Sequence, residues 1–323
     1  MKNLALTALS RIPSPAQRKI FQVRERMMAI TEFYADLRRF LRHSGPSDRV
    51  YDSSGSRGHE AQAIKDYHRI EKGLSLREPR QPFGAEPSQR LRGILATPAV
   101  IAAIPGHVAA AAEEALDGLE QWNNHGEIDS NLAPFVAEPV DGPSVDFFLS
   151  RRSVRNFDPS RVVGQADITH AVEIAQSTPS VCNRQASRVH ILTNPTKIRA
   201  ALKLQSGNAG FGDDITTLAI ITVDTRLFTG VGERNQGWID GGLFAMTFVW
   251  GLHSIGVDSC MLNWSKSNSL SKKLRVLSDI PNSEDIICTV ALGYAPTSSA
   301  RAARSPRRPI SEILTFDSQR NGA

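Results

Sequence analysis

The chain has 323 residues, of which 41% are hydrophobic and 22% charged, so wholesale disorder is excluded and one large or two medium domains are expected. The net charge of +5 is too small to indicate nucleic-acid binding by itself. The charge is unevenly spread: residues 1–92 carry +8, residues 93–140 carry −7 with no Lys or Arg, and residues 141–323 carry +4. This segregation predicts an N-terminal region, residues 1–140, distinct from residues 141–323.

The cysteines are Cys182, Cys260 and Cys288, which are widely spaced and form no CxxC pair. We therefore expect neither a disulfide framework nor a metal site, and a reducing cytoplasm fits three small apolar residues of this kind. The first ten residues, followed by Arg11 and Pro13, are too short an apolar stretch for a signal peptide.

One uncharged stretch, residues 93–112, has the nominal length of a membrane span. It contains Pro98, Pro105 and His107 and is rich in alanine, which inserts weakly. We therefore expect no membrane span, and predict two short helical pieces broken at Pro105, with a span as the alternative.

The N-terminal region is predicted to be mainly helical. Residues 16–42 have apolar side chains at three- and four-residue steps, which are Ile20, Val23, Met27, Ile30, Phe33, Leu37 and Leu41. Further expected elements are a loop at 43–58, a helix at 60–72 with Gly73 as its C-cap, a loop at 77–90, a helix at about 107–124 closed by Gly126, and a linker at 131–144.

The second half mixes helices and strands. Helices are expected at 145–151, at 167–177 with Asp167 as N-cap, and at 239–255, where apolar residues nearly all round indicate burial. Strands are expected at 188–193, 217–223, 258–262 and 286–292. This alternation is typical of an α+β or three-layer fold.

A basic motif opens this half, with Arg151, Arg152, Ser153 and Arg155 within five residues. Guanidinium groups and a hydroxyl are the donors that a phosphate monoester requires. A solvated basic turn is the plain alternative.

Further polar motifs follow in order. Asn183 and Gln185 present carboxamides suited to a planar heterocycle, and the loop at 207–212 adds Asn208 without forming a GxGxxG turn. An Asp-Gly-Gly sequence opens the apolar helix, Leu-Asn-Trp-Ser ends at Ser265, and arginines gather at 301–308.

The motifs are Arg-Arg-Ser-x-Arg-x-Phe, Thr-Pro-Ser-x-x-Asn-x-Gln, Gly-Asn-x-Gly-Phe, Asp-Gly-Gly, Leu-Asn-Trp and the final Gly-Tyr with its Arg cluster. The order of these motifs resembles the nitroreductase superfamily of FMN-dependent flavoproteins, over about residues 145–315. The resemblance implies an α+β fold, a three-layer α-β-α sandwich with a mainly helical N-terminal region. It also implies a homodimer with one FMN at each of two subunit interfaces.

The resemblance also assigns cofactor-binding residues. The phosphate and ribityl chain would be held by Arg151, Ser153 and Arg155, with Arg152 as a neighbour. The ribityl chain and isoalloxazine would lie near Asn183 and Gln185. Asn208 would face the pyrimidine edge. Asn263, Trp264 and Ser265 would lie by the ring, with a backbone N–H near flavin N5. Arg304 and Arg307 match the late phosphate ligands, and Arg308 is an alternative in that register.

Residues 66–76 and Phe83-Gly84 resemble the leader of extended nitroreductase-like proteins associated with polysaccharide biosynthesis. Within this leader, His68 and Glu71 are three residues apart and would share a helix face. A metal or acid–base pair is one interpretation, and an intrahelical hydrogen bond is the other.

These features lead to the hypothesis of an FMN-dependent oxidoreductase that uses NAD(P)H to reduce a nitroaromatic, quinone or related electrophile by a ping-pong mechanism, with no side chain as nucleophile. The alternatives are a different flavoprotein chemistry and an FMN-binding scaffold protein in a polysaccharide biosynthesis pathway. A nucleic-acid binder is disfavoured because interleaved aromatic residues and a known module are missing from the sequence.

Overall fold

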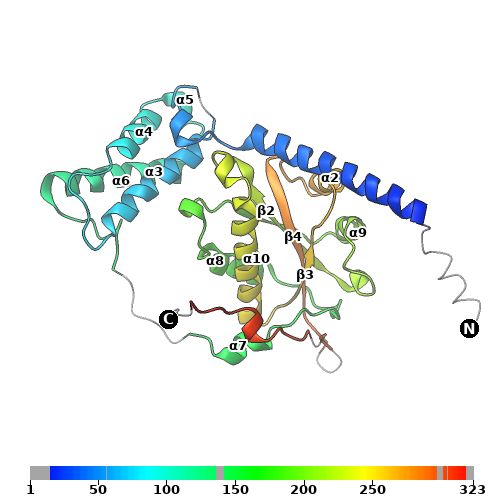
Figure 1. Cartoon of the computed structure of the whole chain (residues 1–323). Coiled ribbons are helices and arrows are strands. Elements are labelled where there is room, and N and C mark those ends of the chain that lie inside the picture. Colours follow the sequence, from blue (N-terminus) through cyan, green and yellow to red (C-terminus); the bar gives the residue numbers. More distant parts are fainter. Residues whose placement is uncertain (1–14, 56, 136–141, 297–300, 304, 318–323) are drawn as a thin grey trace, which may run out of the picture.

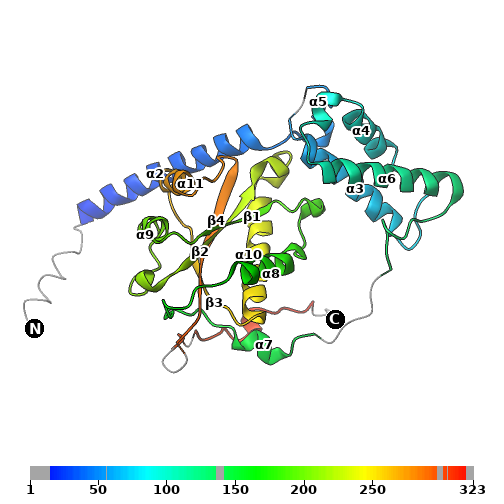
Figure 2. The same ribbon diagram turned by 180° about the vertical axis from the view of Figure 1, so that it is seen from behind.

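The centre of the protein is a four-stranded antiparallel sheet of order β1-β2-β4-β3 (Figures 1 and 2). The computed structural model describes residues 15–55, 57–135, 142–296, 301–303 and 305–317. The strands are β1 (Ser187–Leu192), β2 (Thr217–Asp224), β3 (Asp258–Asn263) and β4 (Glu284–Gly293). The four predicted strands are therefore confirmed, with ends shifted by one or two residues.

Strand β2 is buried along its whole length, so both faces of the sheet need a cover. Alternate side chains point to opposite faces, with Leu218 and Ile220 in one apolar core and Ala219 and Ile221 in the other. The first core also contains residues of α9 (Pro195–Leu204) and α11 (Asn268–Leu277). The second contains residues of α8 (Gln165–Gln176) and α10 (Gln236–Ser254). This is the expected three-layer α-β-α sandwich (Figures 1 and 2).

The N-terminal region is helical, as predicted. Its helices are α2 (Pro15–His43), α3 (His59–Leu74), α4 (Ala85–Leu95), α5 (Pro98–Ile101) and α6 (Gly106–His125), and α7 (Val145–Ser150) follows. Helices α3, α4 and α6 pack around a core of their own, which also takes in Val223, Leu227 and Phe228. In the part of the chain that is described, no helix has the length and apolar character needed to cross a bilayer.

Helix α2 contacts the sandwich through polar side chains. The backbone N and Nδ2 of Asn268 on α11 each donate to Glu32 at 2.8 Å, and Arg39 pairs with Asp285 of β4. The apolar side chains that predicted the helix all lie at least half exposed on other sides of it, which are Ile20, Val23, Met27, Ile30, Phe33, Leu37 and Leu41. The helix thus presents an apolar surface to the outside of the single chain.

Two predictions in the N-terminal region were wrong. Gly73 is not a C-cap but lies inside α3, where a Cβ would come within 2.2 Å of the Phe83 ring, so glycine permits a close contact there. The predicted loop at 77–90 is too long, because α4 begins at Ala85 within it. Gly84, in a left-handed conformation, is the N-cap of this helix. Residues 136–141 of the predicted linker, including the expected boundary, lie outside the described residues.

Two predictions in the sandwich also need correction. Gly164 rather than Asp167 is the N-cap of α8. Helix α10 is not buried all round, because Trp238, Ile239 and Leu243 are each about half exposed. Helices α9 and α11 are additional to the predicted elements, although Asn194 and Ser267 cap them by accepting backbone N–H groups.

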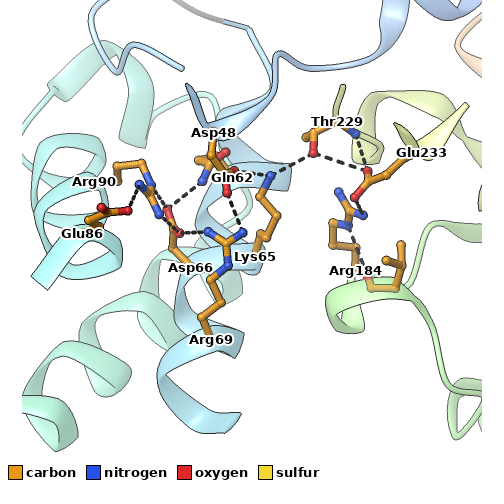
Figure 3. Close-up of polar contacts among 11 residues, drawn as sticks. Asp48, Gln62, Lys65, Asp66, Arg69, Glu86, Arg90, Arg184, Thr229 and Glu233 are labelled. Carbon is orange, nitrogen blue, oxygen red and sulfur yellow. Dashed lines mark hydrogen bonds and ion pairs between the residues drawn. The ribbon is translucent and has the colours of Figure 1, made fainter. Parts of the chain in front are cut away.

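A network of buried and partly buried charges lies inside the N-terminal region (Figure 3). The carboxylate of Asp66 on α3 is fully buried and accepts two hydrogen bonds from Arg90 of α4, each at 2.7 Å. Arg69 donates to Asp66 at 3.1 Å and to Asp48 at 2.5 Å, and Lys65 pairs with Asp48 at 2.5 Å. Paired, hydrogen-bonded charges of this kind fix the positions of α3 and α4.

The Asp48 carboxylate makes stability depend on pH. Burial alone would raise the pKa of Asp48, but hydrogen bonds from Lys65 and Arg69 hold it well below its usual range. Its stabilisation is therefore fully present above the unfolded-state pKa of about 4 and is lost as the pH falls through the lower folded-state value.

In a comparison of the unchanged chain with Asp48→Asn, we expect the difference in unfolding free energy to shrink as the pH falls below about 4. Urea unfolding between pH 7 and 2.5 measures this difference. A difference that stays constant over the range would contradict the assignment.

The contact between α8 and α10 depends on Gly251, whose added Cβ would come within 3.0 Å of the Ala171 carbonyl oxygen and 3.1 Å of its Cα. Because backbone atoms cannot move aside cheaply, Gly251→Ala should destabilise the protein by about 1–3 kcal/mol in urea unfolding. The control is Gly106→Ala at the start of α6, where a Cβ meets nothing within 4 Å. It should not destabilise the chain measurably.

Candidate functional site

The basic motif at 151–157 runs along the outer edge of the sheet, next to β3. Ser153 forms an isolated parallel bridge with Ser259, and the Val154 N–H donates to the Ser259 carbonyl at 3.0 Å. Phe157 is buried in the sandwich core and anchors the end of the segment. The backbone bridge and this anchor hold the motif in an extended conformation, with Arg152 and Arg155 exposed and Arg151 half-buried.

The charge of an arginine from the C-terminal segment acts on Arg151 of this motif. Burial lowers the pKa of Arg151, and the positive charges of Arg152 and Arg307 lower it further. Burial raises the pKa of the Cys260 thiol, and the positive charges of Arg155 and Arg151 act against this rise. Among the described residues, none of these four arginines forms an ion pair with a carboxylate. A cluster of like charges without an acidic partner fits an anion, and Arg304 lies outside the described residues.

Asn183 and Gln185 lie in a tight loop before β1. Cys182, Asn183 and Gln185 have φ angles of 49°, 52° and 48°, a left-handed conformation that is uncommon outside glycine. The Val181 N–H donates to Asp240 at 3.1 Å, and Gln185 Nε2 donates to Asn183 Oδ1 at 3.3 Å. The two predicted carboxamides are thus brought together.

The two halves of the predicted site lie at opposite ends of α10. The Asn183 loop contacts Asp240 near the start of the helix, while the Arg151 guanidinium carbon lies 5.9 Å from the centroid of Trp250 near its end. Ten residues of helix span about 15 Å. One chain therefore does not bring the arginine cluster and the carboxamide pair together.

The remaining predicted polar residues form a third group. Asn208 donates to the Leu202 carbonyl at 2.8 Å and to Gln205 Oε1 at 3.1 Å, and Gln205 donates to the Asn263 carbonyl at 3.1 Å. Asn263 Nδ2 donates to Ser265 Oγ at 3.3 Å. Gln205, which sequence reasoning missed, therefore links the Asn208 loop to the end of β3.

The side chain of Trp264 packs in the sandwich core. Its indole is buried, and Nε1 donates to Ser271 Oγ of α11 at 3.0 Å. The indole is therefore held away from solvent, and the prediction that this residue lies beside a ring stays a prediction about its backbone alone.

A cleft of about 1190 Å³ separates the N-terminal helices from α8 and β1. Its walls include Glu60, Tyr67 and His107 on one side and Asn183 and Gln185 on the other, together with other polar side chains. Burial raises the pKa of Glu60, with help from Asp224, and burial raises the pKa of Tyr67 to about 12. No sequence pattern pointed to this cleft, because its two walls are far apart along the chain.

His68 and Glu71 form a local pair on α3, with Nδ1 and Oε2 2.9 Å apart. No group of three or more His, Cys, Asp or Glu side chains that could hold a metal ion occurs in the described part of the chain. The geometry is that of the intrahelical hydrogen bond.

Solved structures with a similar fold include the FMN-dependent nitroreductase of Clostridium difficile R20291, with 18% identity, TM-score 0.45, and coverage of 54% of this chain and 99% of that one. NfrA2 of B. megaterium has 18% identity, TM-score 0.47, and coverage of 55% and 75%. A nitroreductase family protein of Streptococcus pneumoniae TIGR4 has 18% identity, TM-score 0.45, and coverage of 53% and 98%. A search of curated proteins finds no match.

A family model described as the nitroreductase family matches residues 149–210 and 195–294. The matched segment begins just before the basic motif, includes the Asn183 and Asn208 loops, and ends with β4. Over residues 149–294, this chain is therefore similar to the nitroreductase family.

Proposed function

We propose that this chain is an FMN-dependent oxidoreductase that uses NAD(P)H to reduce a nitroaromatic, quinone or related electrophile. The family match indicates oxidoreductase chemistry. The observation that supports the proposal most directly is the run of Arg151, Arg152 and Arg155 held beside β3 by the Ser153–Ser259 bridge, with the positive charge of Arg307 also acting on Arg151. Guanidinium groups that have no acidic partner among the described residues are the donor set of a phosphate site.

The described residues fit FMN in three groups. The phosphate would be held by Arg151, Arg152, Ser153, Arg155 and Arg307. Arg304 is proposed as a further phosphate ligand from the sequence alone. Asn183 and Gln185 would contact the ribityl chain and ring. The linked Asn208, Asn263 and Ser265 would bind the polar edge of the ring, with the Trp264 backbone N–H beside it.

The bound flavin would supply the redox chemistry, taking reducing equivalents from NAD(P)H and passing them to the electrophile in a ping-pong sequence. The chain's own residues bind and orient it. No side chain needs to act as a nucleophile.

A homodimer would complete this site. The arginine cluster and the carboxamide loop lie about 15 Å apart along α10, so a second copy would bring one chain's arginines to the other's loop. Exposed apolar side chains on α2, α7 and α10 provide surface for such contact, including Ile30, Phe33, Phe148, Trp238 and Ile239. We propose that residues 141–323 form the flavin domain and residues 1–140 an added helical region.

The proposal is tested by purifying the chain and recording its absorption spectrum before and after anaerobic addition of NADH or NADPH. We expect a flavin spectrum that is bleached by the reductant. A chain that gains no FMN on reconstitution would refute the cofactor assignment. A bound flavin that NAD(P)H does not reduce would favour the FMN-binding scaffold protein.

Arg155→Ala should weaken FMN binding by about 1.5–3 kcal/mol, the contribution of a hydrogen bond to a charged group. Fluorescence titration of the flavin-free protein measures the affinity. The matched control is Arg199→Ala on the exposed side of α9, which should leave affinity unchanged. Equal affinities for the two variants would reject the phosphate assignment.

Mixing Arg155→Ala chains with Gln185→Ala chains tests the shared site. In a mixed dimer one site would receive an intact arginine from one chain and an intact glutamine from the other. Refolded or co-expressed mixtures should therefore bind more FMN than either variant alone. Binding no greater than that of the separate variants would show that each site belongs to one chain.

A further inference from the structure

The loop at 181–185 adopts a conformation that its own sequence does not favour. Three non-glycine residues in it have positive φ angles between 48° and 52°. Such conformations persist only when the surrounding structure restrains them. The contacts of this loop should therefore include the groups that hold it in place.

Arg184 is the central restraint. Its side chain is fully buried between the two predicted carboxamides along the chain, and its Nε donates to the Val181 carbonyl at 3.2 Å. One terminal nitrogen lies 2.8 Å from Glu233 Oε1, and the guanidinium carbon is 5.7 Å from the centre of the Phe228 ring. A buried guanidinium must keep its carboxylate partner, so the position of Glu233 determines where the loop can lie.

Glu233 is in turn held by Thr229. Its Oε2 accepts the Thr229 backbone N–H at 2.6 Å and the Thr229 hydroxyl at 3.4 Å. The same hydroxyl accepts a hydrogen bond from Lys65 Nζ at 2.9 Å, and Lys65 pairs with Asp48 (Figure 3). Lys65 is on α3, and its side chain is only 6% exposed.

Backbone hydrogen bonds also join the segment after α2 to the segment around Thr229. The Gly45 N–H donates to the Phe228 carbonyl at 2.8 Å, and the Gly230 N–H donates to the Gly45 carbonyl at 3.0 Å. Thr229 is therefore clamped between the segment after α2 and the segment that carries Glu233. The path from α3 to the carboxamide loop consists of buried and partly buried, directional contacts.

We propose that the network Lys65–Thr229–Glu233–Arg184 positions the 181–185 loop, so that the N-terminal helical region sets the geometry of Asn183 and Gln185 at the FMN site. This inference rests on the proposed function for its consequence in flavin binding. Its structural half, the control of the loop by Thr229 and Lys65, is independent of any cofactor. These four residues are positioning residues.

The test uses the full-length chain with Thr229→Val, which keeps the side-chain shape and removes the hydroxyl, and with Thr229→Ser, which restores it. Lys65→Met removes the far end of the network. The matched control is Thr225→Val, a buried threonine of the same loop whose hydroxyl bonds to Asp285 at 3.1 Å instead. Hydrogen exchange of the flavin-free proteins is followed at the loop amides that are hydrogen-bonded, which are those of Val181, Asn183, Arg184 and Gln185.

We expect Thr229→Val and Lys65→Met to speed exchange of these amides and to weaken FMN binding about 2- to 30-fold, the range that corresponds to coupling through packed networks. Thr229→Ser and Thr225→Val should resemble the unchanged chain in both measurements. Unchanged exchange in Thr229→Val and Lys65→Met would overturn the inference, as would equal effects of Thr225→Val. If the unchanged chain binds no FMN, the proposed function fails, and the exchange measurement alone decides whether the network holds the loop.

Discussion

The rest of the structure depends on the burial of β2. All eight of its residues are buried, so the sheet needs a helical layer on each face, and α8 with α10 and α9 with α11 supply them. The antiparallel order β1-β2-β4-β3 then leaves β1 and β3 at the two edges. The carboxamide loop leads into one edge strand, and the basic motif bridges to the other. The separation of the two groups is thus a consequence of the strand order.

The N-terminal region joins this sandwich in two ways. Apolar side chains of its helices share a core with Val223, Leu227 and Phe228, and buried charges on α3 reach Thr229. Apolar contacts tolerate sliding, whereas hydrogen-bonded charges require particular partners at particular distances. The charged contacts are therefore the ones able to transmit a defined geometry from α3 to the loop that carries Asn183 and Gln185.

Sequence patterns located the strands well because β-branched runs bounded by turns are a local signal. They also indicated the basic motif and the carboxamide pair, whose roles at a flavin stay predictions. Arg184 was not singled out, because a basic residue between Asn183 and Gln185 looks like a surface residue until its burial is known. Trp264 shows the reverse, since its motif pointed to the site while its indole packs in the core. Gly73 was misread because a C-cap and a close contact with Phe83 both favour glycine.

The sequence by itself determined the mixed helix and sheet composition, the helical N-terminal region and the order of the polar motifs, because these follow from local periodicity and residue type. Only the tertiary structure decided which motifs meet. It brought the charge of Arg307 within reach of Arg151 and kept the carboxamide loop at the other end of α10. It also turned the polar side of α2 toward α11 and formed the cleft between the N-terminal helices and α8. These arrangements depend on contacts between residues far apart in the chain, which no local pattern records.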